Sequence, residues 1–159
     1  MVIAVADAVR AAKEEGNISA LVEAIPYLRF LGISADTSSG ELVGKLAYSD
    51  PLIGNASLPA LHGGAIGALL ESTAILQALW EQETSALPKI VTITIDFLRS
   101  GRPVDTFARG VITKAGRRVV NVGVEAWQED RQRPIARANA IFLVSPSEAA
   151  AATPASTRS

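Results

Sequence analysis

A long, mainly apolar stretch runs from Leu61 to Trp80 and reads LHGGAIGALLESTAILQALW, with Glu71 as its one charged side chain. Beyond Gly67 the stretch is built mainly from good helix formers, so it predicts a helix of about five turns. Apolar residues fall on nearly every side of this helix. We therefore expect it to be buried all round.

Four segments that follow this helix have the composition of strands, being dense in Val, Ile and Thr: residues 90–98, 106–114, 118–127 and 135–144. Apolar and polar residues alternate along them, so each presents one apolar face. The connections between them, SGRP, AGR and QEDRQR, are short, which predicts an antiparallel meander. The long helix is the only expected element apolar enough to cover that face of the sheet.

The residues before the long helix predict smaller elements. Residues 33–36 and 42–48 form a predicted hairpin, and residues 2–15 and 19–25 have the spacing of two helices that would form a lid or outer layer. The sequence thus predicts an α+β fold in which a curved antiparallel sheet of about six strands wraps one long buried helix, with extra N-terminal helices.

The chain divides into three predicted parts. Residues 1–26 form an N-terminal helical segment, and residues 27–145 form the main domain. Residues 146–159 are rich in Ala, Ser, Thr and Pro, so we expect them to be a disordered tail.

The start of the long helix, His62-Gly63-Gly64, carries the first candidate chemistry. The backbone N–H groups of a first turn have no partner within the helix and lie at the positive end of its dipole. Such a site can stabilise an oxyanion, and glycine lets a substrate approach the backbone. We expect Gly63 and Gly64 to contact substrate and His62 to cap the helix or orient a group at its entrance; packing alone is the alternative interpretation.

Glu71 is the second candidate. At helical spacing its neighbours include Gly67, Ala68 and Ala74, none of which can neutralise a carboxylate. A solvated surface position is the ordinary interpretation of a helical Glu, but a surface helix would carry more charges than this one. We therefore favour a general base or a nucleophile.

Gly63 and Glu71 are too far apart to act on one carbonyl group within a single chain. Their separation along a helix is about 12 Å, at 1.5 Å per residue. Two antiparallel copies of the helix, related by a two-fold axis, would place the Gly63 N–H of one beside Glu71 of the other. We therefore predict a homodimer with two equivalent sites at its interface.

Two further groups are candidates for substrate binding. Asn55 lies in the turn-rich segment 50–60, and loops so placed commonly carry substrate contacts, although plain turn formation is the alternative. Arg99, Arg117 and Arg118 lie at predicted strand ends, where they would either be solvated turn charges or hold a phosphate at the mouth of a pocket.

Composition argues against several classes of function. A formal net charge of −1 gives no footprint for nucleic acid or an anionic membrane. The chain has no cysteine, which excludes thiolate catalysis, and its single histidine argues against a zinc site. The first residues lack the basic region of a signal peptide, and a membrane span over residues 60–80 would bury Glu71 in the bilayer. We expect a cytoplasmic protein with no metal, nucleic-acid or membrane partner.

Short motifs occur in a fixed order along the chain: LGI at 31–33, LIGN and PALHGGAIGALLE between 52 and 71, IDFLR at 95–99, GRP at 101–103 and GRR at 116–118. This combination, which extends from about Tyr27 to Val144, resembles the hotdog-fold acyl-CoA thioesterases of the phenylacetate-degradation type. The resemblance implies a hotdog fold, an acyl-CoA substrate, and a homodimer that pairs again into a tetramer.

The resemblance also implies roles for the candidate residues. The Gly63 N–H would bind the thioester oxygen, and Glu71 of the partner subunit would attack the carbonyl carbon or activate the water that does. Coenzyme A phosphates would lie near basic turns, which favours Arg117 and Arg118. An Asn is usually found six residues before the His, where this chain has Ala56 with Asn55 one place earlier. Coenzyme A would be part of the substrate, so no cofactor is expected.

We therefore expect hydrolysis of an acyl-CoA thioester to a free acid and coenzyme A. Two alternatives stay open: a non-catalytic acyl-CoA-binding domain, and the hydration or dehydration of an acyl thioester, which the spacing of His62 and Glu71 fits poorly. The chain has no G-x-S-x-G motif, which argues against a serine hydrolase. The sequence alone does not specify the acyl group.

Overall fold

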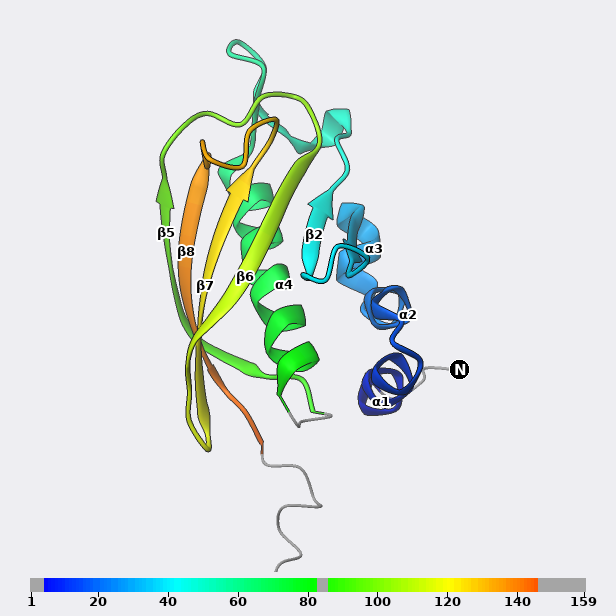
Figure 1. Ribbon diagram of the computed structural model, residues 1–159. Helices are drawn as coiled ribbons and strands as arrows, with labels where there is room; N and C mark the ends of the chain where they lie inside the picture. The colour runs from blue at the N-terminus through cyan, green and yellow to red at the C-terminus, as the bar shows by residue number, and fades with distance from the viewer. Residues whose placement is uncertain (1–4, 83–85, 146–159) are drawn as a thin grey trace, which may run out of the picture.

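The computed structural model describes residues 5–82 and 86–145, and at its centre lies one long helix, α4 (Gly63–Glu81). A six-stranded antiparallel sheet curves around one side of α4, and three short N-terminal helices lie on the opposite side (Figure 1). The predicted α+β architecture, a curved sheet around one long helix with extra N-terminal helices, is therefore confirmed.

The strands follow the predicted segments to within two residues at each end. They are β1 (Ile33–Asp36), β2 (Val43–Leu46), β5 (Lys89–Phe97), β6 (Thr106–Ala115), β7 (Val119–Trp127) and β8 (Ala136–Leu143). A short 3₁₀ turn (Asp50–Leu52) and a separate two-stranded sheet, β3 (Ile53–Asn55) with β4 (Ala60–Leu61), lead the chain into α4.

The N-terminal helices are α1 (Val5–Glu15), α2 (Ile18–Glu23) and α3 (Pro26–Leu31). The first two were predicted, except that residues 2–4 lie outside the described part of the chain. The third was not predicted as a helix. Its helix starts with Pro26, whose fixed φ suits a first helical turn, and it ends at Gly32 in the left-handed conformation (φ 71°). The predicted tail, 146–159, lies outside the described residues.

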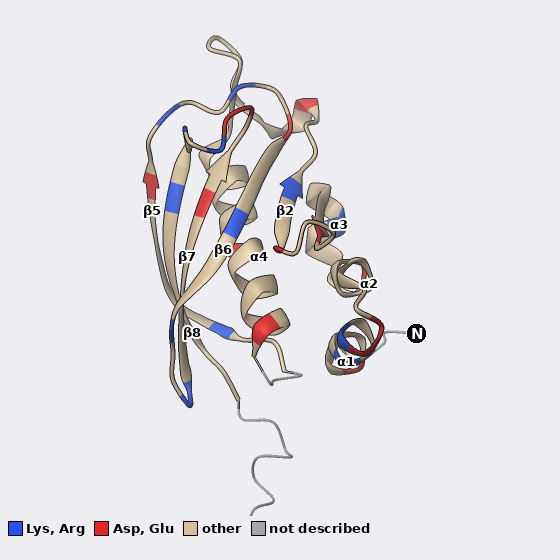
Figure 2. Cartoon of the chain, in the orientation of Figure 1, with Lys and Arg blue, Asp and Glu red and all other residues tan. Residues whose placement is uncertain are grey.

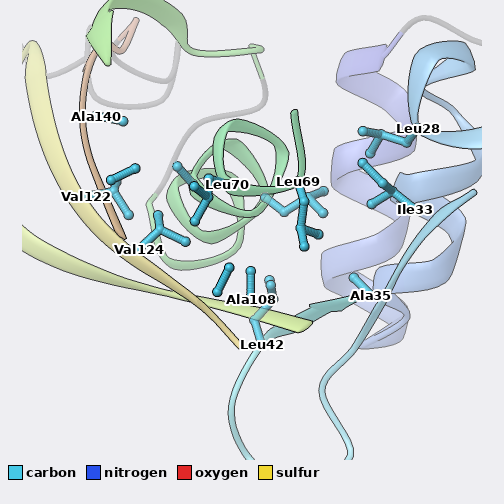
Figure 3. Packing of buried hydrophobic residues seen from close by; sticks show 14 of the residues in the cluster. Leu28, Ile33, Ala35, Leu42, Leu69, Leu70, Ala108, Val122, Val124 and Ala140 are labelled. Atoms are coloured by element: carbon cyan, nitrogen blue, oxygen red, sulfur yellow. The ribbon is translucent and has the colours of Figure 1, made fainter. Parts of the chain in front are cut away.

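The core forms where α4 meets the sheet and the N-terminal helices. Leu70 lies on the side of α4 that faces Val122 and Val124 of β7, and Leu69 lies on the side toward Leu28 and Ile33 (Figure 3). Both leucines are fully buried. Burying a Leu side chain stabilises the folded state by about 1.5–3 kcal/mol relative to leaving it exposed. Because the two leucines point to opposite sides, α4 links the sheet to the N-terminal helices.

The expectation that α4 is buried all round is wrong for the single chain. Gly64 is exposed and Ala68, Glu71 and Ile75 are only half-buried, and these residues follow one another at spacings of four, three and four. Such spacing puts them on one stripe of a helix. One face of α4 is therefore left uncovered. No helix among residues 5–82 and 86–145 is long and apolar enough to cross a membrane.

The predicted meander is wrong for β5. The strand order is β1-β2-β6-β7-β8-β5, so β6, β7 and β8 form the meander while β5 pairs with β8 at the edge of the sheet. The connection from Leu98 to Asp105, which we call the crossover, passes over the ends of β8 and β7 to reach β6 (Figure 1). Three strand spacings are about 14 Å, which this connection can span, so its shortness does not require β5 and β6 to be neighbours.

Hydrogen bonds from the buried side chain of Gln128 hold the crossover in place. Its Oε1 accepts a hydrogen bond from the Arg102 N–H at 3.1 Å, and its Nε2 donates to the Arg102 carbonyl at 2.9 Å and to the Thr106 hydroxyl at 3.1 Å. Next to these hydrogen bonds, the Gly101 carbonyl accepts a hydrogen bond from the Leu61 N–H at 2.9 Å. The connection is thereby fixed against the strand that leads into α4.

The end of the connection is tied to β2 by a carboxylate. Asp105 pairs with Lys45 Nζ at 2.8 Å and accepts the Tyr48 N–H at 2.8 Å, and these donors hold the pKa of its carboxyl below its usual range. The crossover is therefore anchored at both ends.

We expect Gln128→Met to lower the free energy of unfolding by about 1–3 kcal/mol, because it removes three hydrogen bonds and leaves the Arg102 N–H without its acceptor while filling the same space. Urea denaturation of the two proteins measures the difference. Gln132→Met, in an exposed turn, is the matched control and should leave the unfolding midpoint unchanged. Equal unfolding midpoints for the wild type and both variants would show that the hydrogen bonds of Gln128 do not stabilise the fold.

Candidate functional site

The first turn of α4 leaves a single backbone amide free among the described residues. The Gly64 N–H donates to Nδ1 of His62 at 2.8 Å, and the N–H groups of Ala65 and Ile66 donate to the His62 carbonyl at 2.9 and 3.3 Å. His62 thus caps the helix with both its side chain and its backbone. The Gly63 N–H donates to no described residue, so it is available to an oxyanion at the positive end of the helix.

Gly63 lies in a groove of about 450 Å³ that is also lined by the end of β5 and the crossover. Phe97 is 55% exposed in this groove, and a Cβ added to Gly63 would lie 3.2 Å from its ring. Phe97 was not among the predicted site residues, because its alternation pattern assigned it only to the apolar face of a strand. Glycine at position 63 keeps the free amide accessible beside this ring.

Glu71 lies in the middle of α4, two helical turns beyond Gly63, on the uncovered stripe. No described side chain or N–H donates a hydrogen bond to its carboxylate, and it forms no ion pair with a described residue. It borders an apolar cavity of about 180 Å³ between α3 and α4. Within residues 5–82 and 86–145, this carboxylate therefore has no partner.

A single chain does not bring Gly63 and Glu71 together. Both residues belong to one straight helix, where eight positions correspond to about 12 Å. On the edge strand β5, Ile95 lies against Gly67 of α4, and Val91 is 58% exposed. Within the described part of the chain, Gly63 and Glu71 therefore remain two separate candidate groups.

Asn55 is the exposed last residue of β3, directly before a turn. Its Oδ1 accepts the N–H groups of Ser57 and Leu58 at 3.0 and 3.3 Å, a hydrogen-bond pattern typical of Asn in a turn. The structure therefore gives Asn55 a local role, and a role in catalysis stays a prediction.

The candidate arginines lie at opposite ends of the sheet. Arg99 follows β5 at the Gly63 end, where its guanidinium donates to the Pro134 carbonyl at 2.6 Å. Arg117 and Arg118 lie in the exposed turn between β6 and β7, at the other end (Figure 2). Because Lys89 of β5 pairs with Leu143 near this turn and Phe97 lies beside Gly63, the two ends are separated by about 26 Å of strand.

The described residues contain no cluster of three or more His, Cys, Asp or Glu side chains that could hold a metal ion.

Comparisons with known proteins cover the same elements. A family model described as the thioesterase superfamily matches residues 58–135. The medium/long-chain acyl-CoA thioesterase YigI of Salmonella typhimurium is 29% identical over 135 residues, which cover 76% of this chain and 86% of YigI. A Chromobacterium violaceum protein of known structure is 39% identical, with a TM-score of 0.70, over 86% of this chain and 96% of that protein.

A Streptococcus mutans protein solved with bound acetyl-CoA has the same fold at 18% identity and a TM-score of 0.61. The match covers 72% of this chain and 89% of that protein. The residues matched by the family model run from the turn before α4 to the residue before β8, and they contain both candidate residues, Gly63 and Glu71.

We expect His62→Ala to lower the free energy of unfolding by about 1 kcal/mol, because the Gly64 N–H loses its acceptor. His62→Asn keeps a side-chain acceptor of the kind preferred at this position and should restore most of the loss. Urea unfolding of the three proteins measures both effects. Equal losses in the two variants would show that the imidazole acts through packing against Gly54 rather than through the cap.

Proposed function

The chain belongs to the thioesterase superfamily, which confirms the predicted thioester hydrolase, and we propose that its substrate is an acyl-coenzyme A thioester. The observation that carries this proposal is the free N–H of Gly63, the one amide in the first turn of α4 that donates to no described residue. The name of YigI, a medium/long-chain acyl-CoA thioesterase, and the acetyl-CoA bound to the Streptococcus mutans protein support the choice of substrate.

The working unit in this proposal is a homodimer in which two α4 helices run antiparallel. Gly64 and Ala68 on the uncovered stripe are small enough to let two helices approach closely, and the exposed apolar side chains of β5 would be covered at the same time. In such a dimer the Gly63 N–H of one subunit lies beside Glu71 of the partner subunit. Pairing of two dimers into a tetramer, as the resemblance implies, stays a prediction.

The two half-sites then perform complementary steps. The thioester oxygen accepts a hydrogen bond from the Gly63 N–H, which stabilises the negative charge that develops on this oxygen. The carboxylate of Glu71 of the partner subunit either attacks the carbonyl carbon or takes a proton from the water that attacks it. The bond from carbon to sulfur breaks, and coenzyme A leaves as a thiolate. In the general-base route this thiolate takes the proton that Glu71 removed from water; in the nucleophilic route water hydrolyses the anhydride between Glu71 and the acyl group, and a proton from that water goes to the thiolate. Both routes give the free acid and the thiol of coenzyme A. No cofactor is part of the proposal.

The same dimer gives the arginines a common target. Antiparallel subunits place the β6–β7 turn of one near the Gly63 end of the other, so Arg117 and Arg118 of the partner subunit would approach the groove that Arg99 borders. Arginine side chains suit phosphate groups, and Gly64 leaves room for the pantetheine arm. A cytoplasmic location completes the proposal.

We expect Glu71→Gln to lower kcat at least about a hundredfold, because the amide can neither attack the carbonyl carbon nor accept a proton from water. Release of free thiol from a panel of acyl-CoAs measures the rate, with circular dichroism to show that the variant is folded. Equal turnover by both proteins would place the chemistry on another residue. Binding of acyl-CoA by a wild-type protein without turnover would favour the non-catalytic domain.

The shared site predicts complementation between two inactive variants. Gly63→Pro removes the N–H, while Pro is well tolerated at the first position of a helix and His62 already has an extended conformation (ψ 131°). When Gly63→Pro and Glu71→Gln subunits are co-expressed, half of the dimers are mixed and each has one intact site. Thiol release should therefore recover to about a quarter of the wild-type rate. Recovery that is absent despite mixed dimers would mean that each site lies within one chain.

A further inference from the structure

The strand β6 is longer than its neighbour β2, so part of its edge stays open. β6 pairs with β7 along nearly its whole length, but it pairs with β2 only from Thr106 to Arg109. From Gly110 onward, no strand in the described part of the chain pairs with that edge, and Figure 1 shows β6 continuing beyond β2. The backbone N–H and C=O groups along this edge can therefore pair with a further strand.

A groove of about 420 Å³, which we call the β6 groove, follows this open edge. The turn between β1 and β2, the last turns of α4 and the open part of β6 line it. Gln77 of α4 lies directly against the strand, because a Cβ added to Gly110 would be 3.1 Å from the Cβ of Gln77. Trp80 and Glu81, one turn further along α4, also line the groove. The end of α4 thus forms its inner wall.

The open segment of β6 is short and has a defined end. The pairing of β6 with β7 shifts its register between Ile112 and Lys114, and Lys114 is exposed. Bulges and exposed lysines are features that keep an edge strand from pairing with another chain. The segment from Gly110 to Ile112 has neither feature. A strand would therefore add to this segment and no further along β6.

One charge at the β6 groove has no counter-charge among the described residues. Glu81 is exposed and accepts a hydrogen bond from the Gln77 amide, but it forms no ion pair with a described residue. Arg109 and Glu41 also line the groove, yet they pair with each other at 3.0 Å. Trp80 adds a half-buried aromatic ring. A Lys or Arg side chain is attracted by a carboxylate and by such a ring.

We propose that the β6 groove binds an extended segment of another protein, which adds a strand to Gly110–Ile112 in line with β2 and directs a Lys or Arg side chain toward the end of α4. Backbone pairing favours an extended chain, and Glu81 with Trp80 favours the basic side chain. This site is separate from the proposed dimer interface. Gln77 follows Glu71 by six positions, about one and two-thirds helical turns, so it points away from the uncovered stripe.

The test uses the fluorescein-labelled peptide TVTKTVT, in which Lys and both Val lie on one face of an extended chain, with Kd measured by fluorescence anisotropy. Wild-type protein should bind it saturably and should prefer it to TVTETVT. Glu81→Lys should weaken binding of the Lys peptide about tenfold, equivalent to about 1.4 kcal/mol, and should tighten binding of the Glu peptide. Glu15→Lys makes the same charge change at an exposed position of α1 and should leave both Kd values unchanged.

Two N-methylated forms of the Lys peptide test the backbone pairing. An extended chain presents alternate N–H groups to its two edges, so methylation at every Thr blocks one edge and methylation at Val and Lys blocks the other. One form should lose binding and the other should keep it, because only one edge of the peptide pairs with β6.

Several outcomes would overturn the proposal. They are the absence of saturable binding by the wild type, equal binding of the Lys and Glu peptides, equal effects of Glu81→Lys and Glu15→Lys, and equal binding of the two N-methylated forms. If the peptide does not bind and light scattering shows that Glu81→Lys dissociates an oligomer, the occupant of the groove is a second copy of the chain, which also overturns the proposal.

Discussion

The organising constraint of this structure is that one helix, α4, carries both candidate groups, the Gly63 N–H and the Glu71 carboxylate, at positions that cannot meet within one chain. The free Gly63 N–H must lie at the helix start, because only there is an amide without an intrahelical partner. Glu71 lies two turns away on a stripe that neither the sheet nor α3 covers completely. The proposed homodimer depends on two features of this surface, the small residues of the stripe and the edge position of β5.

The sheet and the crossover fix the position of the first turn of α4. Because β5 pairs with β8 at the edge rather than with β6, its last residue, Phe97, reaches Gly63, and the crossover passes close to the helix start. Gln128 fixes the backbone at Arg102, and Gly101 packs against Ile66 of α4. The position of the free amide therefore depends on hydrogen bonds between Arg102 and Gln128, two residues that lie 26 positions apart and outside α4.

Much of the fold could be predicted because its signals are local. The lack of charge in α4 and the alternation in β5 to β8 determine the type and length of each element. The position of β5 could not be predicted, since a short connection limits distance but does not select the neighbouring strand. The six-residue helix α3 is too short to show helical periodicity, so only Pro26 marked its start.

The candidate site could be predicted only in part, for the same reason. Gly63, His62 and Glu71 stand out because their residue types conflict with a purely apolar helix, whereas Phe97 and the cavity beside Glu71 depend on contacts between distant segments. Those contacts also separate two functions of the molecule. The sheet and the crossover surround the free amide of Gly63, while α3 and Ile75 border the cavity beside Glu71. A change in the N-terminal helices can therefore reshape this cavity without moving Gly63, because Gly63 packs against Phe97 of β5 and not against α3.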